Sequence, residues 1–143
     1  MEAAGQQLVP VPPVIKVLIV DDHPMARAVV VDMIASTTGL ALVGTASDGP
    51  QGLALAQSVE PDLVLMDVAM PVMSGIEATR QLLDRRPGTR VLVFSADVRR
   101  DVVRAAREAG AVGFVRKGCR ESEFIRAIRS VMAGRSVWPA PSV

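Results

Sequence analysis

The segment from Pro61 to Gly75, PDLVLMDVAMPVMSG, constrains the fold of this chain more than any other stretch. It opens with a continuous apolar run, LVLM, which is typical of a strand buried on both faces of a parallel sheet. The run ends at one carboxylate, Asp67, and two turn signals, MP and SG, follow it. Open α/β sheets bind ligands where their parallel strands end. Asp67 therefore stands where we expect a functional residue.

Segments with strand and helix periodicity alternate through the chain. The predicted strands are residues 14–20, 40–45, 63–66, 90–94 and 113–116, and the predicted helices are residues 25–36, 50–59, 75–85, 101–109 and 121–133. In the first helix, Met25, Val29, Met33 and Ile34 form the expected apolar stripe. Short connections between parallel strands require right-handed crossovers. The predicted fold class is α/β, a doubly wound five-stranded parallel sheet with helices on both faces.

One domain accounts for the length of 143 residues, half of them hydrophobic. We assign residues 14–134 to it, residues 1–13 to a flexible N-terminal leader with three prolines, and residues 135–143 to a C-terminal tail or the start of a linker. The single cysteine, Cys119, excludes an internal disulfide and a cysteine zinc cluster. No signal peptide is evident and no apolar run approaches ~20 residues. We expect a cytoplasmic protein with no membrane contact.

Polar residues follow four of the five predicted strands. Asp21 and Asp22 come after the first strand, Asp67 after the third, Ser95 after the fourth and Lys117 after the fifth. Parallel strands end at one edge of a sheet, so these side chains should share a crevice. Three neighbouring carboxylates raise one another's pKa unless a cation lies among them. Hard oxygen ligands with room for water suit Mg²⁺, or Mn²⁺ in its place, better than zinc.

These groups are sufficient for phosphoryl transfer to an aspartate. Asp67 would attack phosphorus in line, the metal and Lys117 would offset charge on the equatorial oxygens, and Ser95 would hydrogen-bond one of them. An ionised carboxylate needs no general base. Alone, Asp21 and Asp22 would be interpreted as helix caps. The matching acid at Asp67 favours a site.

The residues lie in the motifs VLIVDDHP, PDLVLMDVAMPVMSG, VLVFSA and GFVRKG, which follow one another in this order within residues 14–133. Together these motifs resemble the receiver domain of two-component response regulators. The resemblance implies a flavodoxin-like sheet of strand order 2-1-3-4-5. It also implies that a sensor histidine kinase phosphorylates Asp67. A receiver is a phosphoacceptor with intrinsic autophosphorylation and autodephosphorylation chemistry only, not an enzyme in the ordinary sense.

The same resemblance implies a role for each matching residue. Asp22, Asp67 and the backbone carbonyl of Ala69 would bind Mg²⁺ directly, and Asp21 would act through water. Lys117 matches the lysine of the site. The switch residues would be Ser95, which matches the hydroxyl, and Phe114, which matches the aromatic side chain that reorients on activation.

The stretches DDHP, GTASDG and VMAG most resemble the NarL/FixJ subfamily, in which a receiver usually precedes a helix-turn-helix domain. The resemblance implies control of transcription through a DNA-binding domain that is absent from this chain. A stand-alone receiver acting through protein–protein contacts is the alternative.

Arginines are concentrated in, or directly before, the last two predicted helices: Arg99, Arg100, Arg104, Arg107, Arg126 and Arg129. The resemblance implies that this face rearranges on phosphorylation, so a homodimer through the fourth and fifth helices is one prediction. The simpler alternative is that these charges only keep the protein soluble. We interpret His23, the one histidine, as a loop residue at the rim of the site. Trp138 is expected to pack on the last helix or to mark a linker contact.

Other functions share parts of the pattern. A haloacid-dehalogenase-like phosphatase also uses an aspartate nucleophile and Mg²⁺, but typically has a second acid two residues later, where this chain has Ala69. A flavodoxin-like flavin carrier would need a Ser/Thr-rich phosphate loop and aromatic rings, whereas DDHP is acidic and tyrosine is absent. A receiver that is never phosphorylated is disfavoured because all five expected site positions are filled.

Overall fold

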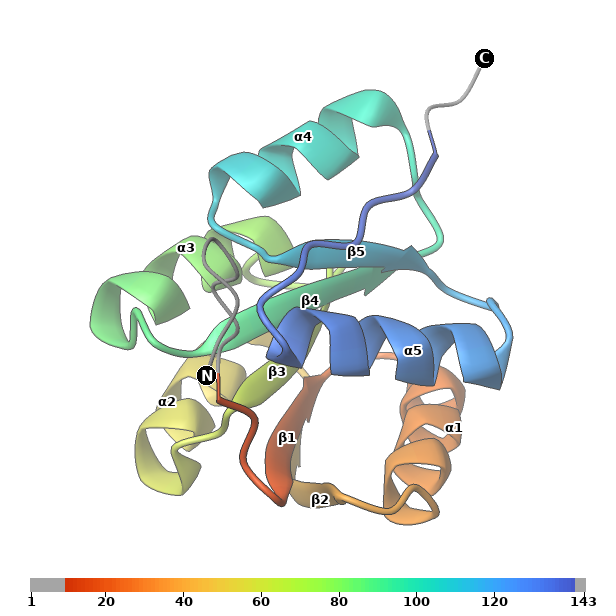
Figure 1. Ribbon diagram of the computed structural model, residues 1–143. Coiled ribbons are helices and arrows are strands. Elements are labelled where there is room, and N and C mark those ends of the chain that lie inside the picture. The colour runs from red at the N-terminus through yellow and green to blue at the C-terminus, as the bar shows by residue number, and fades with distance from the viewer. Residues whose placement is uncertain (1–9, 141–143) are drawn as a thin grey trace, which may run out of the picture.

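The computed structural model describes residues 10–140, which form one parallel sheet flanked by helices (Figure 1). The elements in chain order are β1 (Ile15–Val20), α1 (Pro24–Ala35), β2 (Leu40–Ala46), α2 (Gly49–Val59), β3 (Leu63–Asp67), α3 (Gly75–Arg85), β4 (Arg90–Ser95), α4 (Arg100–Glu108), β5 (Gly113–Arg116) and α5 (Glu121–Met132). All neighbouring strands are parallel, in the order β2-β1-β3-β4-β5. The predicted fold class and strand order are confirmed.

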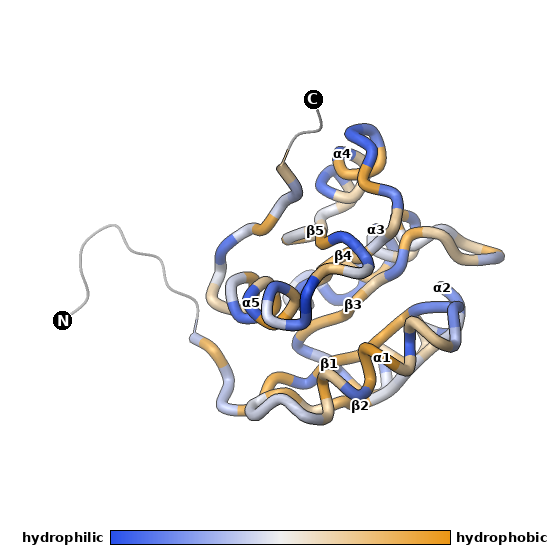
Figure 2. The backbone as a smooth tube through the Cα atoms, turned by 90° about the vertical axis from the view of Figure 1, so that its right-hand side faces the viewer, coloured by the Kyte–Doolittle hydropathy of each residue, from blue (hydrophilic) through white to orange (hydrophobic). Residues whose placement is uncertain are grey.

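Two hydrophobic cores lie on opposite faces of the sheet. Successive residues of β1 alternate between them: Val17 and Ile19 pack with α1 and α5, and Leu18 and Val20 pack with α2, α3 and α4. Figure 2 shows the hydrophobic colour running along β1 and β3. Because the central strands are covered on both faces, their sequences are continuous apolar runs.

The predicted bounds of every strand and helix agree with the structure to within one residue. The expected stripe of α1 is wrong at two positions, because Met25 is 85% exposed and Val29 is 67% exposed. The buried face of α1 is instead Val30, Met33 and Ile34. A helix that packs on a sheet through one narrow face leaves the residue next to that face in solvent.

The ends of the chain differ in how far the structure describes them. The predicted leader falls mainly outside the described residues, of which Pro10 to Pro13 form no helix or strand. After α5 the chain runs back across β5 toward α4 (Figure 1), and Val137 pairs with Gly113 in a parallel bridge. Trp138 packs against the core on the α4 side of the sheet, and it also lines a groove with residues of α5 such as Ala127. Within residues 10–140, no helix has the length and apolar character needed to span a membrane.

Candidate functional site

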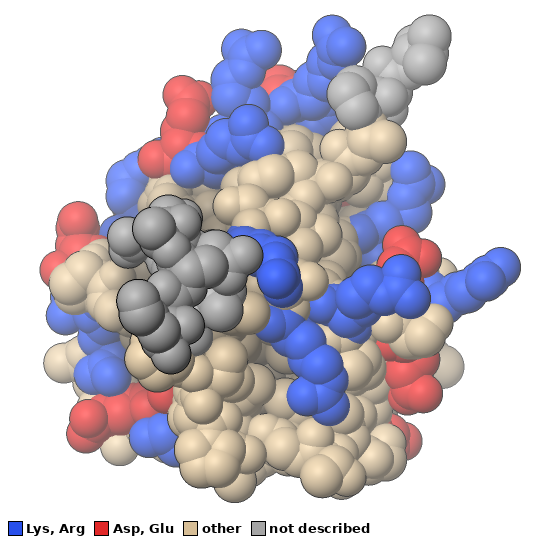
Figure 3. Space-filling model, in the orientation of Figure 1, with Lys and Arg blue, Asp and Glu red and all other residues tan. Residues whose placement is uncertain are grey.

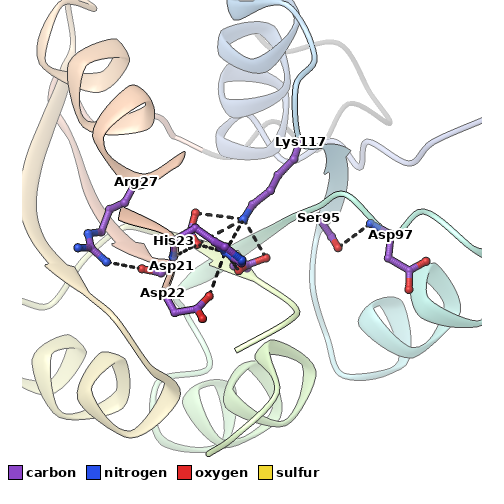
Figure 4. A network of polar contacts seen from close by, with 8 residues as sticks. Asp21, Asp22, His23, Arg27, Ser95, Asp97 and Lys117 are labelled. Carbon is purple, nitrogen blue, oxygen red and sulfur yellow. Dashed lines mark hydrogen bonds and ion pairs between the residues drawn. The ribbon is translucent and has the colours of Figure 1, made fainter. Parts of the chain in front are cut away.

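Three carboxylates and one ammonium group meet at the C-terminal edge of the sheet. Asp21 is fully buried and Asp67 is 2% exposed, whereas Asp22 keeps 26% of its side chain in solvent. Lys117 Nζ lies 3.2 Å from Asp21 Oδ2 and 3.3 Å from Asp67 Oδ1. Figure 4 shows the side chains of Asp21, Asp22 and Lys117 pointing toward one another. The structure thus brings these predicted site residues together.

Strand register explains why these residues meet. Val20 pairs with Met66, Asp67 pairs with Phe94, and Ser95 pairs with Arg116. Asp21 therefore comes level with Asp67, and Ser95 and Lys117 lie one and two residues further along their own strands, at the same edge of the sheet. Since all strands run the same way, four separate loops deliver their polar groups to one crevice.

The turn after β1 is fixed by hydrogen bonds around Asp21. The backbone N–H of Asp21 continues the sheet by donating to Ala46 O at 3.0 Å. The Asp21 carboxylate accepts the backbone N–H of His23 at 2.9 Å, and Arg27 Nη1 donates to the Asp21 carbonyl at 2.7 Å. Pro24 then opens α1, a position where its missing N–H is not needed. The DDHP sequence therefore fixes Asp21 at the site and places Asp22 directly beside it.

The turn after β3 closes tightly beneath Asp67. Gly75 donates its N–H to Val68 O at 2.8 Å. A Cβ atom at Gly75 would lie 1.8 Å from the carbonyl oxygen of Asp67, so no other residue fits without moving the backbone. Ser74 caps α3 by accepting the N–H of Glu77 at 3.2 Å. The SG pair thus fixes the loop that carries Ala69, which is exposed.

The electrostatics of the two buried acids differ. Burial raises the pKa of Asp67 to about 6, with a further rise from Asp21 and an opposing effect of Lys117. Burial also acts to raise the pKa of Asp21, but hydrogen bonds from His23 and the charge of Lys117 outweigh it, and the pKa of Asp21 is lowered. Lys117 alone therefore does not neutralise the site.

The site can accommodate a hard cation. Three buried carboxylate oxygens, Asp21 Oδ2, Asp22 Oδ1 and Asp67 Oδ2, have no hydrogen-bond partner within the described part of the chain. Each lies 3.0–3.3 Å from a nitrogen of Lys117 or His23, but without hydrogen-bonding geometry. An all-oxygen donor set with spare lone pairs fits Mg²⁺.

The contact of the His23 ring with the carboxylates was not predicted from the sequence. Its side chain is 55% exposed, as expected at the rim, but Nδ1 lies 3.1 Å from Asp21, 3.0 Å from Asp22 and 3.3 Å from Asp67. The hydrogen bond with Asp21 raises the pKa of His23, and Lys117 opposes this rise. The signal available in the sequence was a histidine directly after two aspartates at a strand end.

Ser95 and Phe114 make no hydrogen bond or ion pair with the three carboxylates in the described part of the chain. The Ser95 hydroxyl is buried and accepts the backbone N–H of Asp97 at 3.0 Å, so it faces the chain that leads to α4 (Figure 4). Phe114 is 1% exposed and packs in the core between the sheet and α4. Gly118 follows Lys117 with φ of +88°, which explains glycine at this turn.

Residues 17–129 match the family model of the response regulator receiver domain. The chain belongs to this family. It is 43% identical over 121 residues to the response regulator GacA of Pseudomonas aeruginosa, and 36% identical over 121 residues to the nitrate/nitrite response regulator NarL of Escherichia coli. Each alignment covers 85% of this chain and 56% of the relative, so the receiver spans little more than half of their length.

Solved receivers share the fold. A two-component response regulator of the LuxR family from an Aurantimonas species superposes with a TM-score of 0.83 at 34% identity, covering 87% of this chain and 89% of the other. The predicted resemblance to NarL-type response regulators is confirmed. Family membership favours the receiver over the phosphatase and flavin-carrier alternatives.

Proposed function

We propose that Asp67 is the phosphoacceptor of this receiver and that a sensor histidine kinase is its donor. The observation that carries the proposal is a buried carboxylate at the end of β3, 3.3 Å from the Lys117 ammonium and flanked by two more acids. An Asp67 oxygen forms the new bond to phosphorus as the bond from phosphorus to the donor breaks, and the donor group leaves. In this proposal the chain accepts one phosphoryl group on Asp67 as a signal and does not turn over a substrate.

Asp22, Asp67 and the backbone carbonyl of Ala69 would hold Mg²⁺ or Mn²⁺, with Asp21 acting through water. The unpartnered oxygens of all three aspartates support this assignment. When bound, the cation supplies positive charge for the phosphoryl oxygens. Lys117, 3.3 Å from Asp67, would supply a second positive charge, and Asp21 orients Lys117 through a 3.2 Å ion pair.

Ser95 and Phe114 would couple the modified site to the output. The Ser95 hydroxyl accepts the N–H of Asp97 and keeps its own O–H, which it could donate to a phosphoryl oxygen. The output we propose is transcription, through a DNA-binding domain outside this chain, because the relatives are longer regulators. We also propose a cytoplasmic location and a homodimer through α4 and α5, whose arginines surround uncharged surface in Figure 3.

Intact mass after incubation with acetyl phosphate tests the acceptor directly. We expect a gain of one phosphoryl group with Mg²⁺, little without it, and none in Asp67→Asn. Asp84→Asn is the matched control, since Asp84 is an exposed acid on α3. A phosphoryl group on the Asp67→Asn protein, or none on the wild type, would overturn the proposal.

A further inference from the structure

The segment that follows α5 continues the sheet at its β5 edge. Val137 pairs with Gly113, and the backbone N–H of Phe114 donates to Val137 O at 2.8 Å. A Cβ atom at Gly113 would lie 2.9 Å from Val137 O, so the glycine permits this close approach. We call residues 137–140 the strap. It covers an edge strand that would otherwise present unpaired backbone groups.

The strap packs on both faces of the sheet. Val137 contacts the core shared with α5, and Trp138 contacts the core shared with α4. The guanidinium carbon of Arg107, on α4, lies 4.3 Å from the centre of the Trp138 ring, a cation–π geometry. A groove of about 370 Å³ beside the ring is lined by Phe114 among others. The strap therefore touches α4 through Trp138 and the predicted switch residue Phe114 through its backbone.

Helix α4 contacts the sheet through a short apolar face, in which Val102 and Val103 are only partly buried. Ala106 is its one buried residue, and Arg99 at its N-cap makes no side-chain capping bond. The loop before it is held by the Ser95 hydroxyl, which accepts Asp97 N–H, and by Asp97, which accepts the N–H of Arg99 at 3.1 Å. A helix with so little buried surface is readily displaced. The contact between Arg107 and Trp138 is therefore one of the interactions that hold α4 in place.

Ser95 is hydrogen-bonded both to the loop before α4 and to the residue after β5, the two elements that the strap contacts. Its hydroxyl supports the loop that leads to α4, and its carbonyl accepts the backbone N–H of Lys117 at 2.9 Å, directly after β5. If the Ser95 side chain turns toward Asp67 to donate its O–H to a phosphoryl group, its oxygen moves away from the Asp97 N–H and that hydrogen bond weakens. The loop before α4 then loosens, and the Arg107 side chain moves relative to Trp138.

We propose that the strap holds α4 and β5 in the unphosphorylated arrangement and that phosphoryl uptake at Asp67 releases it. The inference rests on the proposed function, since the trigger is the phosphoryl group. Because two linked equilibria affect each other by the same factor, a chain without the strap contact should bind a phosphoryl mimic more tightly.

Trp138 reports on the strap alone, because the chain has one tryptophan and no tyrosine. We expect beryllofluoride with Mg²⁺ to shift its emission to longer wavelength and to speed hydrogen exchange at the Phe114 amide by about tenfold or more. Asp67→Asn should show neither change. Arg107→Gln should shift the emission before any addition and tighten beryllofluoride binding about two- to fivefold. Arg85→Gln, at an exposed position on α3, is the matched control and should behave as wild type.

The outcomes separate this inference from the proposed function. If intact mass shows the phosphoryl group on Asp67 while Trp138 emission and Phe114 exchange stay unchanged, the strap does not respond and the inference is overturned alone. Wild-type emission and wild-type affinity in Arg107→Gln would overturn it as well. A protein that takes up neither phosphoryl group nor beryllofluoride would overturn both, since no trigger would exist.

Discussion

Replacing Asp67 with asparagine should stabilise the metal-free protein at neutral and alkaline pH. Burial raises the pKa of Asp67 to about 6, compared with 3.8 as its ordinary value. Above pH 6 the folded protein must hold this carboxylate ionised in an unfavourable place. Asparagine has almost the same shape and no charge, so the variant removes that penalty.

The magnitude follows from the difference between the folded and unfolded pKa values. Each pKa unit is worth about 1.4 kcal/mol, so the free energy of unfolding of Asp67→Asn should exceed that of wild type by about 3 kcal/mol at pH 8. Between pH 4 and pH 6 the folded protein binds more protons than the unfolded chain, so wild-type stability falls through this window as pH rises. The advantage of the variant should therefore shrink toward zero near pH 4.

Urea unfolding followed by circular dichroism, in EDTA at pH 4.5, 6 and 8, measures this difference. Asp84→Asn, which removes an exposed acid, should stay within about 0.5 kcal/mol of wild type at each pH. Saturating Mg²⁺ should narrow the gap, because it binds the folded wild type. Equal stabilities of wild type and Asp67→Asn at pH 8 would refute the reasoning that Asp67 is an uncompensated buried charge.

Three further substitutions test separate parts of the site. Asp22→Asn should weaken Mg²⁺ binding at least about tenfold by calorimetry, because it removes an oxygen ligand, and unchanged affinity would exclude Asp22 from the metal site. Lys117→Gln should keep Mg²⁺ binding but slow phosphoryl uptake at least about tenfold, and a wild-type rate would show that its charge is not used. Gly75→Ala should lower the free energy of unfolding by about 2 kcal/mol or more, because its Cβ meets the Asp67 carbonyl. Gly88→Ala, where a Cβ meets nothing within 4 Å, is its control and should be nearly neutral.

Much of the site was predictable because all strands of a parallel sheet end at the same edge. An apolar run gives a strand, and the residue after it falls at the ligand-binding edge whatever the details of packing. Asp21, Asp67 and Lys117 therefore converge as expected, from positions far apart in the sequence. The position of each of these three residues follows from the local sequence pattern and from the geometry of a parallel sheet.

Side-chain contacts and backbone pairing that do not follow from the strand ends were not predictable from the sequence. The direction of the His23 ring depends on which carboxylates surround it, and periodicity does not report this. Val29 lies one position away from the buried face of α1, so a small rotation of the helix decides its exposure. Val137 pairs with β5 through its backbone, in a segment whose prolines and lack of periodicity indicate a loop.

The most direct test of the account is the chemical identity of the modified residue. Borohydride reduces an aspartyl phosphate to homoserine, which peptide mapping by mass spectrometry can locate. After treatment with acetyl phosphate and Mg²⁺, we predict homoserine at position 67 and at no other aspartate. Homoserine at position 21 or 22, or none at all in a protein that has gained a phosphoryl group, would contradict the assignment of Asp67 as the acceptor.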